Sequence, residues 1–214
     1  MSVILWGCAD DDNLQEVLPV NSENTEESLY LENGNEVIIY PNGVAVEKLP
    51  DGRIVWGGDM VLNEKQLQML TEPETRAGII RDISMLWPDG IVYYTLSDEI
   101  LQSGVYIDVQ LAMEHYEDQC NISFHKKQSN TENWIEFVPS DNDLNQSHLG
   151  MTGGMQNIWL TSNVNVSTVI HEIGHALGMI HEHQRMDRDN YIVVDYNNIQ
   201  PQWQQWVYRT SIPH

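Results

Sequence analysis

Basic residues are scarce in this chain of 214 residues. Ten lysines and arginines stand against 32 aspartates and glutamates, so the formal net charge is −22. A surface this acidic repels the phosphates of nucleic acids and anionic membranes, so we expect no nucleic-acid partner. The sequence also has no run of about 18 apolar residues, the length that a membrane-spanning helix needs. We therefore expect no membrane span.

Cysteine is equally rare. Cys8 and Cys120 are the two cysteines, too few for a disulfide framework. Cys8 ends the apolar run Met-Ser-Val-Ile-Leu-Trp-Gly-Cys, which resembles the end of a bacterial lipoprotein signal. This run has no positively charged start and is shorter than a complete signal. We predict an exported protein, with a possible lipid anchor at Cys8.

The first third of the chain divides into two segments. Residues 9–30 are polar and acidic, and with the apolar run before them we predict a flexible leader over residues 1–30. Residues 31–62 contain short β-prone runs separated by Pro41-Asn-Gly and Pro50-Asp-Gly, which are turn signals. They predict a small β-meander that ends at Trp-Gly-Gly-Asp59. A short helix over 63–71 and an exposed linker to Arg76 follow.

The remainder, residues 77–214, mixes strands and helices. Residues 91–96, 121–124, 134–138 and 157–160 have the composition of strands. Residues 97–117 place apolar side chains at helical spacing, and a second helix begins near Ser167. We predict an α+β fold with a twisted, mostly parallel or mixed sheet and two long helices.

The candidate site residues begin in the second predicted helix. They lie in the segment His171-Glu-Ile-Gly-His-Ala-Leu-Gly-Met-Ile-His. A helix places His171 and His175 on one face, where both can bind one metal ion. Gly178 can take the left-handed conformation that ends a helix and lets His181 return as a third ligand. Three histidines beside the carboxylate of Glu172 are typical of a catalytic Zn²⁺ site. The alternative is three ordinary surface or core histidines.

The extended pattern H-E-x-x-H-x-x-G-x-x-H is that of the metzincin class of metalloproteases. With the following Arg185-Met-Asp-Arg-Asp-Asn-Tyr, the sequence resembles the astacin family of zinc metalloendopeptidases from about Ala77 to its end. Cys120-Asn-Ile-Ser-Phe and Gly153-Gly-Met-Gln-Asn-Ile-Trp-Leu resemble strands of that family.

The resemblance implies a metzincin catalytic domain with one Zn²⁺ per chain and Glu172 as the general base. It implies a secreted enzyme that cleaves proteins or peptides. It also suggests that the strand over 157–160 is a sheet edge on which an extended peptide could pair.

The resemblance further implies a zymogen, with residues 31–76 as propeptide. Trp-Gly-Gly-Asp59 resembles the family's inhibitory motif, whose aspartate occupies the open zinc position. Cys8 is the alternative inhibitory ligand, because a thiolate also binds zinc. A trypsin-like protease would cut between Arg76 and Ala77, and the freed amine would pair with Glu182.

The sequence departs from the family after the third histidine. The family continues into a Met-containing turn and a zinc-binding tyrosine, and Trp203 to His214 contain no Ser-x-Met-His-Tyr match. We therefore expect residues 77–214 to form the upper lobe alone, without the C-terminal lobe. The competing hypothesis is a truncated, non-catalytic surface or binding lipoprotein in which zinc contributes only folding energy.

Overall fold

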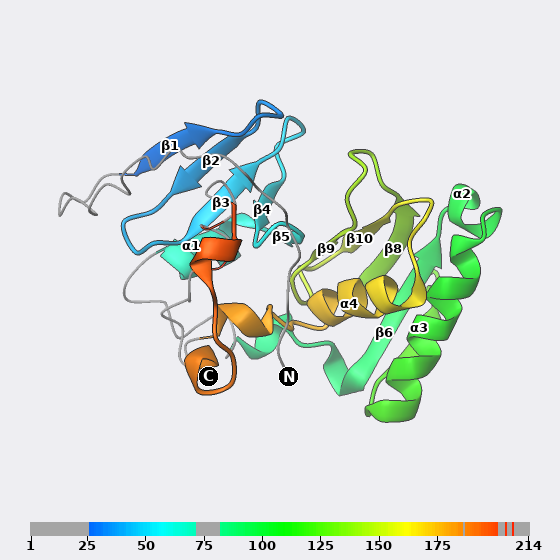
Figure 1. Cartoon of the computed structure of the whole chain (residues 1–214). Helices are drawn as coiled ribbons and strands as arrows, with labels where there is room; N and C mark the ends of the chain where they lie inside the picture. The colour runs from blue at the N-terminus through cyan, green and yellow to red at the C-terminus, as the bar shows by residue number, and fades with distance from the viewer. Residues whose placement is uncertain (1–25, 72–81, 186, 201–203, 205–206, 208–214) are drawn as a thin grey trace.

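The computed structural model describes residues 26–71, 82–185, 187–200, 204 and 207 (Figure 1). The predictions for Cys8, Arg76 and Ala77 fall outside these residues. In the described ranges, no helix is long and apolar enough to cross a membrane.

The described strands form one mixed sheet in the order β1-β2-β3-β4-β5-β9-β10-β8-β6-β7. The first five strands and the helix after them form what we call the N-terminal meander. Its elements are β1 (Glu27–Tyr30), β2 (Glu36–Ile39), β3 (Ala45–Lys48), β4 (Ile54–Trp56), β5 (Met60–Leu62) and α1 (Glu64–Thr71). Neighbouring strands of the meander are antiparallel.

Glycine turns connect these short strands as the sequence predicts. Gly43 and Gly52 have φ of 83° and 93°, the left-handed region that glycine enters without steric cost. The prediction of a flexible leader up to residue 30 is wrong for residues 27–30, which form β1. They pair with β2, because Leu29 lies opposite Val37 and packs on the buried cluster of Val37 and Ala45.

The residues from 82 onward form what we call the C-terminal portion. Its strands are β6 (Ile91–Leu96), β7 (Ser123–Lys126), β8 (Trp134–Pro139), β9 (Gln146–His148) and β10 (Met155–Leu160). Its α-helices are α2 (Asp98–Leu101), α3 (Val105–Gln119) and α4 (Val166–Ala176), and short 3₁₀ turns span 83–85, 88–90, 182–184, 188–190 and 196–198. The helix predicted within residues 97–117 is confirmed as α3, whose buried positions are those that the spacing indicated. Its start differs, because residues 98–101 form the separate short helix α2 and Gly104 stands at the N-cap position of α3.

α3 and α4 pack side by side against the C-terminal strands (Figure 1). Their apolar faces close over Val92, Ile135, Phe137 and Ile158 in the main core. The Tyr116 hydroxyl on α3 donates a hydrogen bond to the Ile170 carbonyl at 3.0 Å. α4, which carries the predicted metal ligands, therefore rests on a rigid support.

The meander joins the C-terminal portion through a parallel ladder between β5 and β9. The Ser147 and Leu149 amides donate to the carbonyls of Asp59 and Val61 at 3.0 and 3.1 Å. β10 lies between β8 and β9, so the prediction that residues 157–160 form a sheet edge is wrong. The strand of the C-terminal portion that meets the meander is β9, only three residues long.

His148 on β9 makes the stability of the intact chain depend on pH. Burial lowers its pKa from 6.5 to about 4, and the Arg53 guanidinium acts in the same direction. The unfolded chain therefore binds the proton first, and stability present above pH 6.5 is lost as the pH falls towards 4. Since His148 keeps some exposure, we expect a loss of about 2 kcal/mol, measured by urea unfolding across this range.

The variant His148→Gln should lose less stability between pH 7 and pH 4.5 than the wild type. His125→Gln, at an exposed histidine on β7, is the matched control and should follow the wild-type curve. Equal pH dependence of His148→Gln and the wild type would contradict this assignment.

Candidate metal centre

α4 begins and ends at residues suited to those positions. The Asn165 side chain accepts a hydrogen bond from the Thr168 amide and caps the N-terminus. Val169 and Ile173 are fully buried, which stabilises the helix by about 1.5–3 kcal/mol for each side chain. At the other end Gly178 has φ of 100°, and its amide donates to the His175 carbonyl at 2.8 Å. This turn reverses the chain towards His181.

The three histidines converge through their Nε2 atoms. The Nε2 of His171 lies 2.9 Å from that of His175 and 3.2 Å from that of His181. Nitrogen ligands at about 2.0–2.1 Å around a tetrahedral Zn²⁺ lie roughly 3.3 Å apart. The observed spacing is therefore close to that of three imidazoles sharing one zinc ion.

Hydrogen bonding and burial hold part of this cluster. The Met179 carbonyl lies 2.6 Å from Nδ1 of His175, the kind of contact that fixes a tautomer with Nε2 free to bind metal. The His175 and His181 side chains are 3% and 9% exposed, whereas that of His171 is 45% exposed. The site therefore opens to solvent on the side of His171.

Glu172 lies beside the histidine cluster and is buried. Its Oε2 accepts no hydrogen bond within the described part of the chain. Burial raises the pKa of Glu172 to about 9, and the negative charge of Asp59 adds to the effect. A buried carboxyl with an unused oxygen next to three histidines is suited to exchange a proton with a molecule bound there.

Asp59 of the N-terminal meander closes the cluster. Its carboxylate oxygens lie 3.1 Å from Nε2 of His171, 3.1 Å from that of His181 and 3.5 Å from that of His175. Burial alone would raise the pKa of Asp59, but its hydrogen bonds to the three histidines outweigh this and hold it well below the usual range. These four side chains can together hold one metal ion.

The two glycines before Asp59 allow this approach. Gly57 and Gly58 have φ of 68° and 99°. A Cβ atom on Gly57 would lie 3.0 Å from His181 Nδ1 and 2.9 Å from the end of Met60. Glycine at position 57 thus lets the backbone pass close to His181, so that the Asp59 carboxylate can lie against the three histidines.

A cleft of about 470 Å³ borders the site. It is lined by Asp59, Asn145, Asn165, Ser167, Thr168, His171 and Glu172. The polar wall of this cleft was not among the features predicted from the sequence. The capping pattern Asn165-Val-Ser-Thr168 could have placed part of it at the helix start, but no local signal marks Asn145.

Glu182 lies in the turn after the third histidine and pairs with Arg185. The Arg185 guanidinium donates to the carboxylate of Glu182 at 2.9 Å and to that of Asp187 at 3.0 Å. The Glu182 side chain is 82% exposed. It is therefore accessible to a further cationic partner. Its predicted partner, the amine of Ala77, lies outside the described residues.

Comparisons with known proteins agree with this site. Residues 79–211 match the family model described as Astacin, a peptidase family. Astacin-like metalloprotease toxin 2 of Loxosceles intermedia is 33% identical over 166 residues, which cover 75% of this chain and 59% of the toxin. Zinc metalloproteinase nas-17 of Caenorhabditis elegans is 33% identical over 144 residues, 66% of this chain and 33% of that protein. This chain therefore spans less than two thirds of either relative.

A solved structure shows the same likeness. High choriolytic enzyme 1, a hatching enzyme zinc-protease of the medaka Oryzias latipes, superposes with a TM-score of 0.54 at 27% identity. The match covers 61% of this chain and 67% of that enzyme.

Proposed function

Because this chain belongs to the astacin family of zinc metalloproteases, we propose that it is a zinc-dependent endopeptidase kept latent by its N-terminal meander. The observation that carries the proposal is the convergence of three histidine Nε2 atoms, the buried Glu172 and the Asp59 carboxylate. The spacing of the nitrogens and the free oxygen of Glu172 fit a zinc ion held by His171, His175 and His181.

A zinc ion held by His171, His175 and His181 would supply a Lewis acid for a peptide carbonyl and would lower the pKa of a bound water to about 7. Glu172 acts as the general base, taking a proton from the attacking water and delivering it to the departing amine. Departure of Asp59 removes one of the two causes that raise the pKa of Glu172 and so favours the ionised base. His175, fixed through the Met179 carbonyl, keeps its Nε2 directed at the metal position.

Latency follows from two contacts of the meander, most of which lies in the proposed propeptide, residues 31–76. The Asp59 carboxylate takes the position that water needs, and β5 occupies the hydrogen-bonding edge of β9. An extended substrate would pair with that same edge. Cys8 remains the alternative inhibitory ligand. Asp59 is favoured because its carboxylate lies within 3.1 Å of two of the histidines.

Activation in this proposal is a single cut between Arg76 and Ala77 by a trypsin-like protease. The new amine of Ala77 would compete with Arg185 for Glu182, whose exposed carboxylate leaves room for a second partner. The protein would act outside the cell on proteins or peptides, in line with relatives named as toxins and a hatching enzyme. The apolar run ending at Cys8 supports export and a lipid anchor.

Limited trypsin treatment tests the proposal. Zinc-loaded intact protein should cleave casein slowly or not at all, and cleavage should rise sharply once trypsin has been added and then inhibited. A zinc chelator should abolish this activity, and added Zn²⁺ should restore it, because the three histidines release the metal reversibly. The readout is release of casein fragments, with heat-inactivated protein treated in parallel as control.

One outcome of this experiment would contradict the endopeptidase proposal. If trypsin-treated protein binds one zinc ion per chain and still cleaves no casein or peptide, the endopeptidase proposal is wrong. The alternative of a zinc-stabilised binding or surface lipoprotein would then be favoured.

A further inference from the structure

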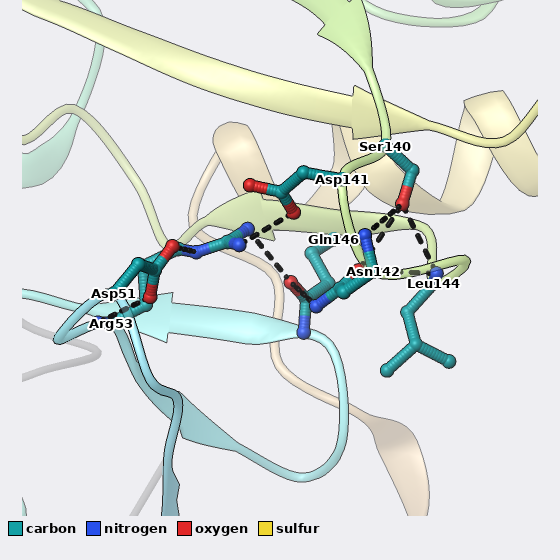
Figure 2. Close-up of polar contacts among 7 residues, drawn as sticks. All are labelled: Asp51, Arg53, Ser140, Asp141, Asn142, Leu144 and Gln146. Atoms are coloured by element: carbon teal, nitrogen blue, oxygen red, sulfur yellow. Dashed lines mark hydrogen bonds and ion pairs between the residues drawn. The ribbon is translucent and has the colours of Figure 1, made fainter.

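Arg53 of the meander is bound by side chains of the C-terminal portion (Figure 2). Its guanidinium donates to Asp141 at 2.6 Å and to Gln146 at 3.1 Å. The guanidinium carbon also lies 4.5 Å from the centre of the Trp159 ring, the arrangement of a cation–π contact. A fourth contact, from Nε to Asp51 at 2.5 Å, stays within the meander. We call Asp141, Gln146 and Trp159 the arginine site.

The arginine site is built without help from the meander. The loop between β8 and β9 is held by its own hydrogen bonds around the Ser140 hydroxyl, which accepts from the amides of Asn142 and Leu144 (Figure 2). The Asn142 side chain also donates to Gln146 Oε1 at 3.2 Å. Since these contacts lie within the C-terminal portion, the arrangement of acceptors does not depend on Arg53.

Arg53 is shielded from water on the side of Gln146 and Trp159 and meets Asp141 at the surface. The Arg53 side chain is 12% exposed, Gln146 and Trp159 are buried, and the Asp141 side chain is 55% exposed. A guanidinium group is planar, so it can stack on an aromatic ring while its N–H groups donate to oxygen atoms around its edge. The ammonium group of a lysine is not planar and is less well suited to this arrangement. The arginine site therefore combines an aromatic contact with two acceptors, whereas a surface ion pair has only the charge contact.

A peptide on β9 would pass beside this site. Val61 of β5 lies opposite His148 and packs in one buried cluster with Val55 and Trp159. A side chain at the position of Val61 in a peptide that replaces β5 would thus lie against the Trp159 ring. From there an arginine could extend along the ring to Gln146 and Asp141.

We propose that Asp141, Gln146 and Trp159 form an arginine-recognition site for peptide substrates, which Arg53 fills in the latent chain. This inference rests on the proposed function, since a substrate reaches the site only after the meander leaves β9. Removal of the meander takes away both Arg53 and Asp51, which leaves Asp141 free to pair with the substrate's guanidinium.

The first test uses the intact chain. Arg53→Ala should lower Tm by a few degrees, and millimolar N-acetyl-arginine amide should restore part of this loss by filling the vacated site. The uncharged analogue N-acetyl-citrulline amide should not. Adding Asp141→Asn to Arg53→Ala should abolish the rescue, whereas adding Asp143→Asn, at an exposed position of the same loop, should keep it. Equal rescue by both compounds, or rescue that survives Asp141→Asn, would overturn the proposal.

The second test uses trypsin-cleaved protein carrying Glu172→Gln, so that peptides bind without turnover. Labelled extended peptides with one arginine moved through successive positions are compared with glutamine counterparts by fluorescence anisotropy. One register should bind about tenfold tighter with arginine, and Asp141→Asn should reduce that ratio to about one. Absence of any arginine gain would refute the site. An Asp141-dependent gain in a protein whose wild type cleaves no peptide would refute the endopeptidase proposal alone.

Discussion

Replacing Glu172 by glutamine in the trypsin-activated protein should lower kcat for peptide cleavage by about 10²- to 10⁴-fold, the contribution expected of a general base. Glutamine keeps the size of the side chain and cannot accept the proton from water. The three histidines remain, so the protein should still bind one zinc ion per chain. Peptide hydrolysis measures kcat, and metal analysis of the purified variant measures zinc content.

Glu114→Gln is the matched control for this variant, because it makes the same chemical change at an exposed position of α3. It should retain wild-type kcat and zinc content. Undiminished turnover in the Glu172 variant would mean that another group takes the proton and would remove Glu172 from the mechanism. Loss of zinc together with activity would instead indicate that Glu172 supports the histidines structurally.

Replacing Asp59 by asparagine should release activity without any cut at Arg76. The amide has nearly the same shape as the carboxylate, but it carries no negative charge to pair with a metal ion or with the three histidines. We expect casein cleavage by the intact chain to rise by about 10- to 100-fold, because hydrogen bonds to charged groups contribute about 1.5–3 kcal/mol. β5 still covers β9 in this variant, so activity should stay below that of the trypsin-cleaved wild type.

The control variants also separate the two candidate inhibitory ligands. Asp118→Asn, at an exposed position near the end of α3, should leave the chain latent. Cys8→Ser should leave it latent as well if Asp59 is the ligand. An active Cys8→Ser variant beside a latent Asp59→Asn variant would assign inhibition to the thiolate.

The metal ligands could be predicted because their geometry is local. His171 and His175 are one helical turn apart, and Gly178 brings the chain back within a few residues. Each relation depends on backbone rules that hold wherever the segment lies in the fold. The approach of Asp59 to these histidines was predicted differently, from a resemblance, since no local rule joins residues 59 and 171.

The junction between the two parts of the sheet could not be predicted in this way. β5 and β9 are three residues each, and Gln146-Ser147-His148 has neither alternation nor β-branched residues. Gln146 and Ser147 are nonetheless fully buried, because the strand lies between β5 and β10. The assignment of residues 157–160 to an edge came from the resemblance alone, and β9 is the strand that covers this side of β10.

The break between α2 and α3 and the strand β1 also depend on tertiary context. Ile100 and Leu101 lie before the break and Val105 after it, so the apolar spacing alone does not locate the boundary between the two helices. Glu27–Tyr30 has an acidic, polar neighbourhood, and only its pairing with β2 makes it a strand. The Arg53 contacts with Asp141 and Gln146 likewise join residues 88 and 93 positions apart, beyond the reach of any spacing rule.

The short length of β9 bears on whether copies of the proposed processed form would associate with one another. In the proposed activation, loss of β5 would leave the C-terminal strands ending in an unpaired edge, and such edges can pair with other copies and cause aggregation. Here the bared edge presents three polar residues, too few for a stable stack between molecules. Residues 77–214 hold 17 acidic and 6 basic residues, and this excess of negative charge would add repulsion between copies. The same short strand that pairs with β5 in the intact chain would therefore limit self-association of the proposed processed form.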